Sequence, residues 1–338
     1  MTGKERFKAI ISHKSDHCGF WHGCPNPASI EKLYAYFNVK NDFELGLKLG
    51  ADCRWVMPEH NKAWQKTDIP MFDVLGGKKR ASLSEAGVFA ETDNIAEIES
   101  FPWPETKDLD FTETLAEIDK TIAAGQAVLS GMWCSFYHAT SDFFGMENYF
   151  MKMYTDPAIV DAVTRHIVDF YLEANEKLFK LAGKKIDAFF FGNDFGSQLD
   201  LLVSPDHFDR FIMPYFREFT EQGHRHGYNV VLHSCGSIDR VIPRLIDSGV
   251  EVLHPIQARA KNMDAESLAK KYNGKIVFLG GVDTQQILPF GTPDQVRAEV
   301  RRIKKIFGPN FIVSPSHESI LPNVSPENIT AMAETAAE

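Results

Sequence analysis

The stretch Tyr228-Asn-Val-Val-Leu-His233-Ser-Cys235-Gly236 ends an apolar run with two side chains of the metal-binding type. Alternate residues of a β-strand face the same side, so a strand over this run would project His233 and Cys235 together from its C-terminal end. Imidazole and thiolate are ligands that zinc prefers. A chelating pair at the end of a strand, followed by Gly and then a helix, predicts chemistry rather than packing.

Around this run, short β-branched or aromatic segments alternate with amphipathic helical stretches from about residue 125 onward. The alternation is typical of repeated βα units. The continuous apolar character of the segments indicates parallel strands that are covered on both faces. We expect strands at Ala127 to Met132, Ile186 to Gly192, Tyr228 to Leu232, Glu251 to Pro255, Lys275 to Gly280 and Phe311 to Ser314.

The helices between these strands start with strong capping residues. Thr292-Pro293-Asp294-Gln295 supplies an N-cap, a proline at the first helical position and a glutamine at the third. We expect three further pairs of N-cap and proline at Asp156-Pro157, Ser204-Pro205 and Ser325-Pro326.

The first third of the chain predicts two more strands, Cys18 to His22 and Ala51 to Met57, with helices over Ile30 to Phe37 and Phe43 to Leu49. Residues 58–104 are rich in proline and glycine and read as a long elaborated connection, with a hairpin around residues 80–91.

Eight predicted strands are the number that closes a single (β/α)8 TIM barrel, and no linker divides residues 1–338. An α/β barrel with its active site at the C-terminal ends of the strands is therefore the expected fold. A doubly wound open sheet is the alternative, but no Gly-x-Gly-x-x-Gly follows the first strand.

The composition limits the function classes. The chain has 338 residues, 44% of them hydrophobic and 24% charged, with a formal net charge of -10, which argues against a nucleic-acid partner. No segment approaches the ~20 apolar residues of a membrane span, so we expect no membrane partner. Five scattered cysteines suit a reducing compartment. We expect a cytoplasmic protein with a small-molecule substrate, which could form a homodimer.

Polar and ionisable residues gather where the predicted strands end, which is where barrels of this type carry their functional residues. We expect Asp194 and Asp283 to handle protons or orient the substrate. Each has a structural alternative, since Asp194 could cap its loop and Asp283 could cap a helix around Gln285 to Leu288. The residues expected to contact the substrate are Trp21, His22, Asn193 and Gln257.

A third zinc ligand is expected from Pro315-Ser316-His317, which closes the last predicted strand. Together, His233, Cys235 and His317 would leave one position of a tetrahedral zinc open, as catalytic zinc sites do. Water, a substrate thiol or a carboxylate from Asp194, Asp283 or Glu318 would fill it.

Three motifs resemble the uroporphyrinogen decarboxylase superfamily: His233-Ser-Cys235-Gly236, Gly280-Gly281-Val282-Asp283-Thr284, and Pro315-Ser316-His317 with Ser325-Pro326-Glu327-Asn328-Ile329. The resemblance covers nearly the whole chain and implies a (β/α)8 barrel with its pocket at the strand C-termini.

Within the superfamily, the chain is more similar to the zinc-dependent cobamide methyltransferase branch than to the decarboxylases. The decarboxylases carry Arg-Gln-Ala-Gly-Arg after the first strand to bind propionate groups, whereas this chain has Trp21-His22-Gly23-Cys24-Pro25-Asn26. The methyltransferases hold zinc with His-x-Cys and a later Cys. His233 and Cys235 match the first two ligands, and His317 stands where the later Cys would be.

The resemblance implies that zinc activates a thiol that attacks a methyl group on a corrinoid, so the expected cofactors are zinc and a corrinoid methyl carrier. A corrinoid protein is a possible partner. The acceptor would be a small thiol or tetrahydrofolate; with folate, Asp194 or Asp283 could steer a proton to the pterin nitrogen. A cofactor-independent decarboxylase and a zinc hydrolase are the alternatives.

Overall fold

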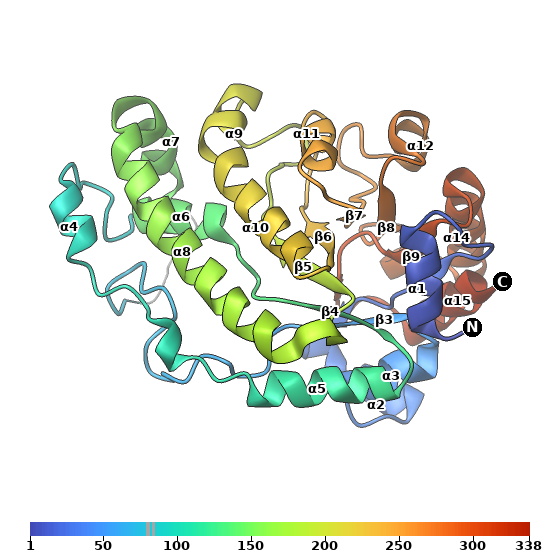
Figure 1. Ribbon diagram of the computed structural model, residues 1–338. Helices are drawn as coiled ribbons and strands as arrows, with labels where there is room; N and C mark the ends of the chain where they lie inside the picture. Colours follow the sequence, from blue (N-terminus) through green and yellow to red (C-terminus); the bar gives the residue numbers. More distant parts are fainter. Residues whose placement is uncertain (79–81, 83–84) are drawn as a thin grey trace.

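Eight parallel strands form a nearly closed barrel surrounded by helices in the computed structural model, which describes residues 1–338 apart from 79–81 and 83–84 (Figure 1). This arrangement confirms the predicted (β/α)8 TIM barrel, and the sequential strand order differs from that of a doubly wound sheet. The order around the barrel is β1 (Gly19–Phe20), β9 (Phe311–Pro315), β8 (Val277–Val282), β7 (Val252–His254), β6 (Asn229–His233), β5 (Ala188–Gly192), β4 (Ala127–Ser130) and β3 (Cys53–Val56).

The strands bury both of their faces, which explains their continuous apolar sequences. In β5, Ala188 and Phe190 point into the barrel, whereas Phe189 and Phe191 pack under the surrounding helices. The same alternation in β6 sends Val231 inward and both Val230 and Leu232 outward. The residue two positions after Val231, His233, therefore also points into the barrel, at its C-terminal mouth.

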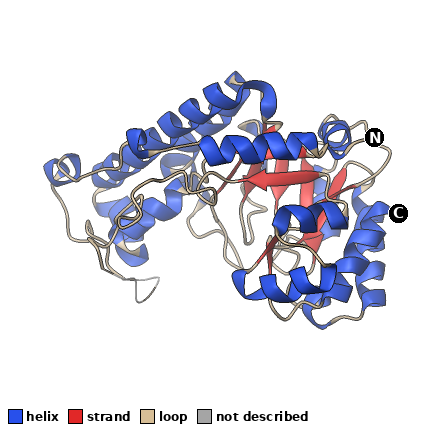
Figure 2. Cartoon of the chain, turned by 90° about the horizontal axis from the view of Figure 1, so that it is seen from below, coloured by secondary structure: helices blue, strands red, loops and turns tan. Residues whose placement is uncertain are grey.

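Helices cover the outside of the barrel, as the view from below shows (Figure 2). The longest, α8, lies beside α6 and α10. Their bounds are α1 (Gly3–Ile11), α2 (Ile30–Phe37), α3 (Asp42–Leu49), α4 (Ile95–Glu99), α5 (Thr112–Ala123), α6 (Phe136–Phe144), α7 (Met146–Thr155), α8 (Pro157–Ala182), α9 (Pro205–Phe211), α10 (Met213–Arg225), α11 (Ile242–Asp247), α12 (Ala265–Tyr272), α13 (Ile287–Phe290), α14 (Pro293–Phe307) and α15 (Pro326–Ala337).

All four predicted pairs of N-cap residue and proline start a helix, and three of the four N-cap side chains accept a capping hydrogen bond. Thr292 and Gln295 form a complete capping box at α14, and Ser204 and Ser325 accept hydrogen bonds at the starts of α9 and α15. Asp156 precedes α8, but its side chain makes no capping bond there; it accepts a hydrogen bond from the neighbouring Thr155 hydroxyl instead. The predicted helix start at Asp156-Pro157 is therefore confirmed, without a capping hydrogen bond from the Asp156 side chain.

The connection after β3 packs against the outer helices. The expected hairpin around residues 80–91 lies partly outside the described residues, and the described residues of that range contain no strand. There, the backbone N–H of Phe89 donates to the carbonyl of Phe143 in α6 at 2.8 Å, so the backbone hydrogen bond goes to a helix rather than to a second strand. A short parallel pair, β2 (Cys24–Pro25) with β10 (Ser319–Ile320), joins two loops.

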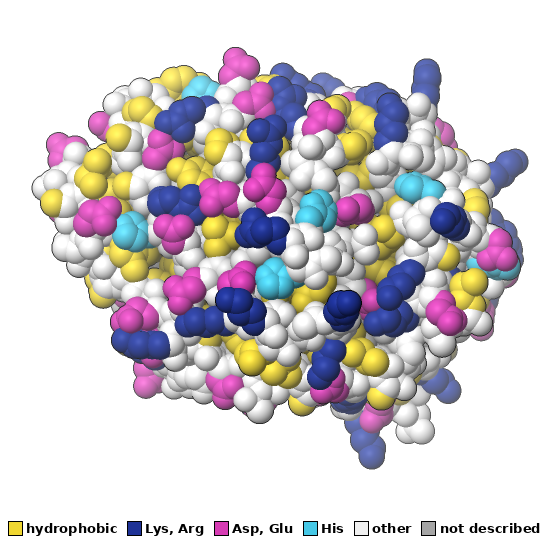
Figure 3. Space-filling view, viewed as in Figure 1, with side chains coloured by type: hydrophobic (Ala, Val, Ile, Leu, Met, Phe, Trp, Pro, Cys, Tyr) yellow, Lys and Arg dark blue, Asp and Glu magenta, His cyan; other side chains and the backbone are white. Residues whose placement is uncertain are grey.

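The surface mixes charges of both signs. On the face drawn in Figure 3, Lys and Arg side chains lie interspersed with Asp and Glu, without an extended basic stripe. Among the helices of the described residues, none combines the length and the apolar character needed to cross a bilayer.

Asp52 joins the two ends of the sheet, where β1 and β3 form no ladder with each other. Its backbone N–H donates to the carbonyl of Phe20 at 2.8 Å, and its Oδ2 accepts from the N–H of Phe20 at 2.8 Å. Its Oδ1 accepts from Nη1 of Arg6 in α1 at 2.7 Å. One buried carboxylate therefore satisfies both a strand end and the helix that covers the closure.

We predict that Asp52→Ala lowers the free energy of unfolding by about 2–4 kcal/mol, because the N–H of Phe20 and the Arg6 guanidinium lose a charged acceptor. Urea unfolding followed by circular dichroism measures this. The control is D294A, since Asp294 lies in the first turn of α14 with a highly exposed side chain. Equal stability of D52A and D294A would contradict the role of Asp52 in closing the barrel.

Candidate metal centre

The loop after β6 holds His233 and Cys235 in place through its backbone. The N–H of Ser234 donates to the carbonyl of His254, and the N–H of Cys235 donates to Oδ1 of Asp194 at 2.8 Å. The next N–H, of Gly236, donates to Oε1 of Gln257 at 2.6 Å. Three successive amide groups thus have acceptors from the ends of neighbouring strands, so the loop has a defined position.

Glycine at position 236 is required by two features of the loop. Its φ is +88°, which side-chain-bearing residues rarely adopt. A Cβ there would lie 2.1 Å from the carbonyl oxygen of Gly196, in the loop after β5. The two loops that carry Asp194 and Cys235 therefore touch backbone to backbone.

His233, Cys235 and Asp194 converge on one point at the barrel mouth. Nε2 of His233 lies 3.4 Å from Sγ of Cys235 and 3.2 Å from Oδ1 of Asp194. Ligand bonds of about 2.0–2.1 Å to nitrogen or oxygen and 2.3 Å to sulfur, set at tetrahedral angles, separate ligand atoms by roughly 3.3–3.6 Å. The three residues thus fit the donor set and the spacing of a zinc site.

The other nitrogen of His233 faces a second pair of groups. Its Nδ1 lies 3.0 Å from Nδ1 of His254 and 3.5 Å from Oε2 of Glu318. Among the described residues, two groups have ligand atoms that all lie within 4.8 Å of one another: Asp194 with His233 and Cys235, and His233 with His254 and Glu318. The imidazole of His233 belongs to both groups and separates them.

The charges at the centre are strongly coupled. Burial alone would raise the pKa of Asp194, but the hydrogen bond and charge of His233 outweigh it and hold that pKa well below 3.8. Burial would lower the pKa of His233, but Glu318, Cys235 and Asp194 outweigh it and raise the pKa well above 6.5. Without a metal ion, His233 and Asp194 therefore form an ion pair in which the imidazole is buried and the carboxylate side chain is 42% exposed.

His317, the third predicted ligand, lies beside Cys235 but belongs to neither compact group. A hydrogen bond with Cys235 is the main reason that its pKa is raised. Its Nδ1 accepts from the N–H of Ser319 at 3.1 Å, and its side chain is 43% exposed. The structure therefore brings two of the predicted ligands together with Asp194, and leaves His317 at the solvent side of the thiol.

Asp283 accepts backbone hydrogen bonds from the turn that leads into α13, whose N-cap residue is Gln286 rather than Asp283. Its Oδ1 accepts from the N–H groups of Gln285 and Gln286, at 2.7 and 3.1 Å, and its Oδ2 accepts from Nε of Arg259 at 2.7 Å. Among the described residues, no hydrogen bond or ion pair joins Asp283 to His233 or Cys235. Its catalytic role stays a prediction, and the contacts that it makes are structural.

Two of the residues expected to contact substrate lie away from the centre or deep below it. His22 is buried, and its Nε2 lies 3.0 Å from Oδ1 of Asp42 in α3, on the outer side of the barrel. Trp21, one residue earlier, points inward and packs against Phe190 and His254. Successive residues of an extended segment face opposite sides, so the two could not both line the barrel mouth.

Asn193 and Gln257 lie at the centre and position backbone. The amide of Asn193 accepts from the N–H of Tyr137 at 2.9 Å and donates to the carbonyl of Cys134 at 2.9 Å. It thereby ties the end of β5 to the start of α6. Gln257 accepts from Gly236 as described above.

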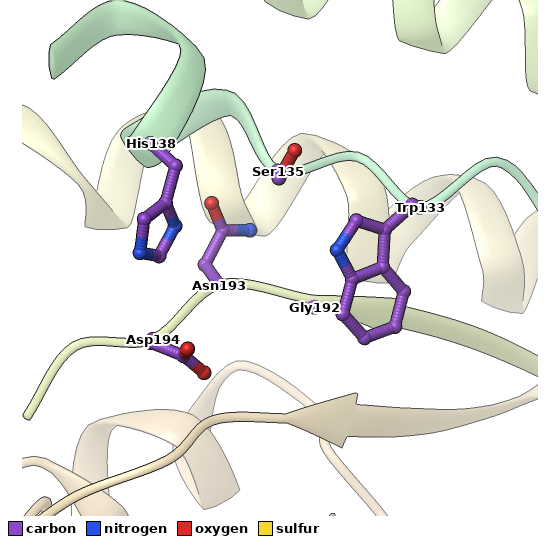
Figure 4. Close-up of a pocket in the computed structure, with 6 residues that line it drawn as sticks. All are labelled: Trp133, Ser135, His138, Gly192, Asn193 and Asp194. Atoms are coloured by element: carbon purple, nitrogen blue, oxygen red, sulfur yellow. The ribbon is translucent and has the colours of Figure 1, made fainter. Parts of the chain in front are cut away.

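A cavity of about 240 Å³ adjoins the centre (Figure 4). Its lining joins the end of β5 to the loop before α6 and holds no Lys or Arg. The lining residues are Trp133, Ser135, His138, Gly192, Asn193 and Asp194. His138 was missed by sequence reasoning because it lies in the first turn of a helix. Burial lowers its pKa below 6.5, which favours the neutral imidazole at pH 7.

Glu59 supports the cavity wall from behind. Its Oε1 accepts from the N–H of Trp133 at 2.8 Å, whereas its buried Oε2 has no hydrogen-bond partner. The indole of Trp133 in turn lies 5.2 Å, centroid to centroid, from the ring of His233. Burial raises the pKa of Glu59 to about 7. Its position just after β3 was the available sequence signal.

We predict a pH-dependent stability from Glu59. The native state binds its proton more tightly than the unfolded state, so this contribution is complete below pH 4.5 and is lost as pH rises through 7. The unfolding free energy of wild type relative to Glu59→Gln should fall by about 3 kcal/mol between pH 4 and 8. Denaturant unfolding across this range measures it. The control E113Q, at an exposed glutamate, should show no such change; a flat E59Q difference would contradict the assignment.

For Asn193 we predict a structural effect. Asn193→Ala should lower the unfolding free energy by about 2–4 kcal/mol, because the N–H of Tyr137 and the carbonyl of Cys134 lose their buried partners. The comparison is N148A, since Asn148 makes a single bond, to the carbonyl of Phe144 at 3.2 Å. Thermal unfolding checks both. Loss of substrate affinity at unchanged stability would show that Asn193 binds substrate instead.

Known proteins resemble this chain in sequence and in fold. A solved methyltransferase from Methanosarcina mazei superposes with a TM-score of 0.68 over 100% of this chain and 98% of that chain, at 17% identity, which is a likeness of fold. A uroporphyrinogen decarboxylase from Chlorobium phaeobacteroides is 25% identical over 142 residues, which are 40% of this chain and 38% of that protein. The family model of uroporphyrinogen decarboxylase (URO-D) matches residues 83–338. This chain, with its His-x-Cys centre at the barrel mouth, therefore belongs to the uroporphyrinogen decarboxylase family.

Proposed function

We propose that this chain is a zinc-dependent methyltransferase that moves a methyl group between a corrinoid carrier and a small thiol or tetrahydrofolate. The observation that carries the proposal is the convergence of Nε2 of His233, Sγ of Cys235 and Oδ1 of Asp194 within ligand spacing. The fold shared with a methyltransferase is consistent with it. When bound, zinc lowers the pKa of a thiol beside it, so that a thiolate is available at neutral pH.

His233, Cys235 and Asp194 would hold the ion and leave one tetrahedral position open for the acceptor, while His317 lies beside Cys235 on the solvent side. Relative to the predicted ligands, the carboxylate of Asp194 takes the place of the His317 imidazole. Two anionic ligands offset the divalent charge, which favours a nucleophilic rather than merely acidic bound thiol. A cation bound here would replace the imidazolium proton as the positive partner of Asp194.

The cavity beside the centre supports a small acceptor. Trp133 gives it one flat apolar wall, and Asp194 joins it to the ligand cluster. His138 lines the same cavity with a neutral imidazole and can accept the proton that an acceptor thiol releases. Ser135 offers a hydroxyl for orientation. In this proposal His138 takes the proton-handling role, while Asp194 orients Cys235 through its backbone N–H.

Decarboxylation is the second candidate, because the family and one relative carry that name. A porphyrinogen with several carboxylates needs cationic partners. The cavity lining has none, and its volume of about 240 Å³ suits a much smaller molecule. These two features favour methyl transfer over porphyrinogen decarboxylation.

We predict about one zinc ion per chain in the purified protein. Cys235→Ala and His233→Ala should each lose most of the metal, because each removes a ligand. Inductively coupled plasma mass spectrometry measures the content. The control is C18A, whose thiol donates to the carbonyl of Gly308 and lies outside both ligand groups.

The same samples test the reaction. Wild type, but not C235A, should demethylate methylcobalamin in the presence of a thiol or tetrahydrofolate, followed by the visible absorbance of the corrinoid. Metal-free protein that decarboxylates a porphyrinogen would refute the proposal in favour of the second candidate. Zinc-containing protein that hydrolyses esters or amides without demethylating methylcobalamin would favour a hydrolase.

A further inference from the structure

We infer that His254 is a positioning residue, which fixes the tautomer and the ring orientation of His233 so that its Nε2 faces the ligand cluster. The inference rests on the proposed metal centre and adds a residue that neither the sequence motifs nor the family match distinguishes. It is based on the distance of 3.0 Å between Nδ1 of His233 and Nδ1 of His254, at the ends of two adjacent strands.

The register of the barrel creates this pair. His233 in β6 and His254 in β7 are direct partners in the parallel ladder. Each stands two residues beyond an inward-facing valine, Val231 or Val252, so both side chains point into the barrel. The two imidazole rings meet with their centroids 5.0 Å apart.

The proton between the two rings is carried by Nδ1 of His233. A neutral His233 that offers its Nε2 lone pair to a metal must carry its proton on Nδ1. That N–H can donate only to an acceptor, so Nδ1 of His254 must be unprotonated and the His254 proton must reside on Nε2. In the metal-free ion pair with Asp194, His233 again donates through Nδ1. The direction of the hydrogen bond is therefore the same in both states.

His254 is placed to hold that direction. It is fully buried, and its ring packs edge-on against Trp21 and Phe190, at centroid distances of 5.2 and 5.5 Å. Its Nε2 has no hydrogen-bond partner among the described residues. An unpartnered polar atom in an apolar barrel interior is costly, and a Leu or Phe would fill this position without that cost. The histidine therefore serves the one polar contact that it makes, with His233.

Glu318 is the competing acceptor for the same N–H. Its Oε2 lies 3.5 Å from Nδ1 of His233 and equally far from Nδ1 of His317. At that distance a hydrogen bond is not formed, whereas the 3.0 Å contact with His254 is within range. Glu318 contributes negative charge to the centre, whereas His254 accepts the hydrogen bond that orients the ring of His233.

Two substitutions of His254 distinguish its role as a hydrogen-bond acceptor from its role as a packed ring. Asparagine places its Oδ1 near the position of Nδ1, so His254→Asn keeps an acceptor for His233. His254→Phe keeps a buried ring and removes the acceptor. Glu318→Gln is the matched control for the competing carboxylate.

The measurement is the zinc affinity of each purified chain, by competition with a chromophoric chelator. Loss of an outer partner of a metal-bound histidine typically weakens metal binding by about 10–100-fold. We expect a loss of that size in H254F and a much smaller one in H254N and E318Q. Circular dichroism confirms that each variant is folded. Equal affinities of wild type and H254F, or equal losses in H254F and H254N, would overturn the inference.

A second measurement needs no variant to fold. Nitrogen-15 NMR of histidine-labelled, zinc-loaded wild type should show a protonated Nδ1 in His233, an unprotonated Nδ1 in His254 and a protonated Nε2 in His254. The opposite proton assignment would overturn the inference, as would a second zinc that requires His254 as a ligand. Wild type that binds no zinc at all would instead remove the proposed function, so the two failures are distinguishable.

Discussion

The parallel register of β6 with its two neighbours is the constraint on which the centre depends. It places His233 level with Gly192 of β5 and with His254 of β7. Gly192, His233 and His254 therefore lie side by side on three adjacent strands at the mouth of the barrel, and Gly192 has no side chain there. The glycine leaves room for the indole of Trp133, because a Cβ at position 192 would lie 2.2 Å from that ring. One ladder thus sets a metal-type ligand, its neighbour and the cavity wall together.

The periodicities of the sequence determine the barrel well. All eight strands overlap the segments that apolar runs predicted, because burial on both faces leaves an unbroken signal. The approach of His233 and Cys235 also followed from spacing alone, since two residues on one strand end share a side. What depends on period and on strand ends was accessible without coordinates.

Contacts between distant segments were less accessible. Asp194 joins the ligand cluster only because the loops after β5 and β6 touch, and His254 joins it only through a ladder register that no local pattern encodes. His138 and Glu59 gave weak signals, because one starts a helix and the other follows a short strand. His22 follows a strand end, as expected, but its side chain points outward to Asp42. The preceding residue, Trp21, is the one that points into the barrel.

The contact between Gly196 and Gly236 has an evolutionary consequence. A Cβ on either glycine would strike the other loop's backbone, at 2.7 Å from one side and 2.1 Å from the other. An insertion in either loop, or a larger residue at either glycine, would separate Asp194 from Cys235. Insertions are therefore better tolerated elsewhere, for example in the long connection after β3, whose backbone contacts the outer helix α6 rather than the loops of the ligand cluster.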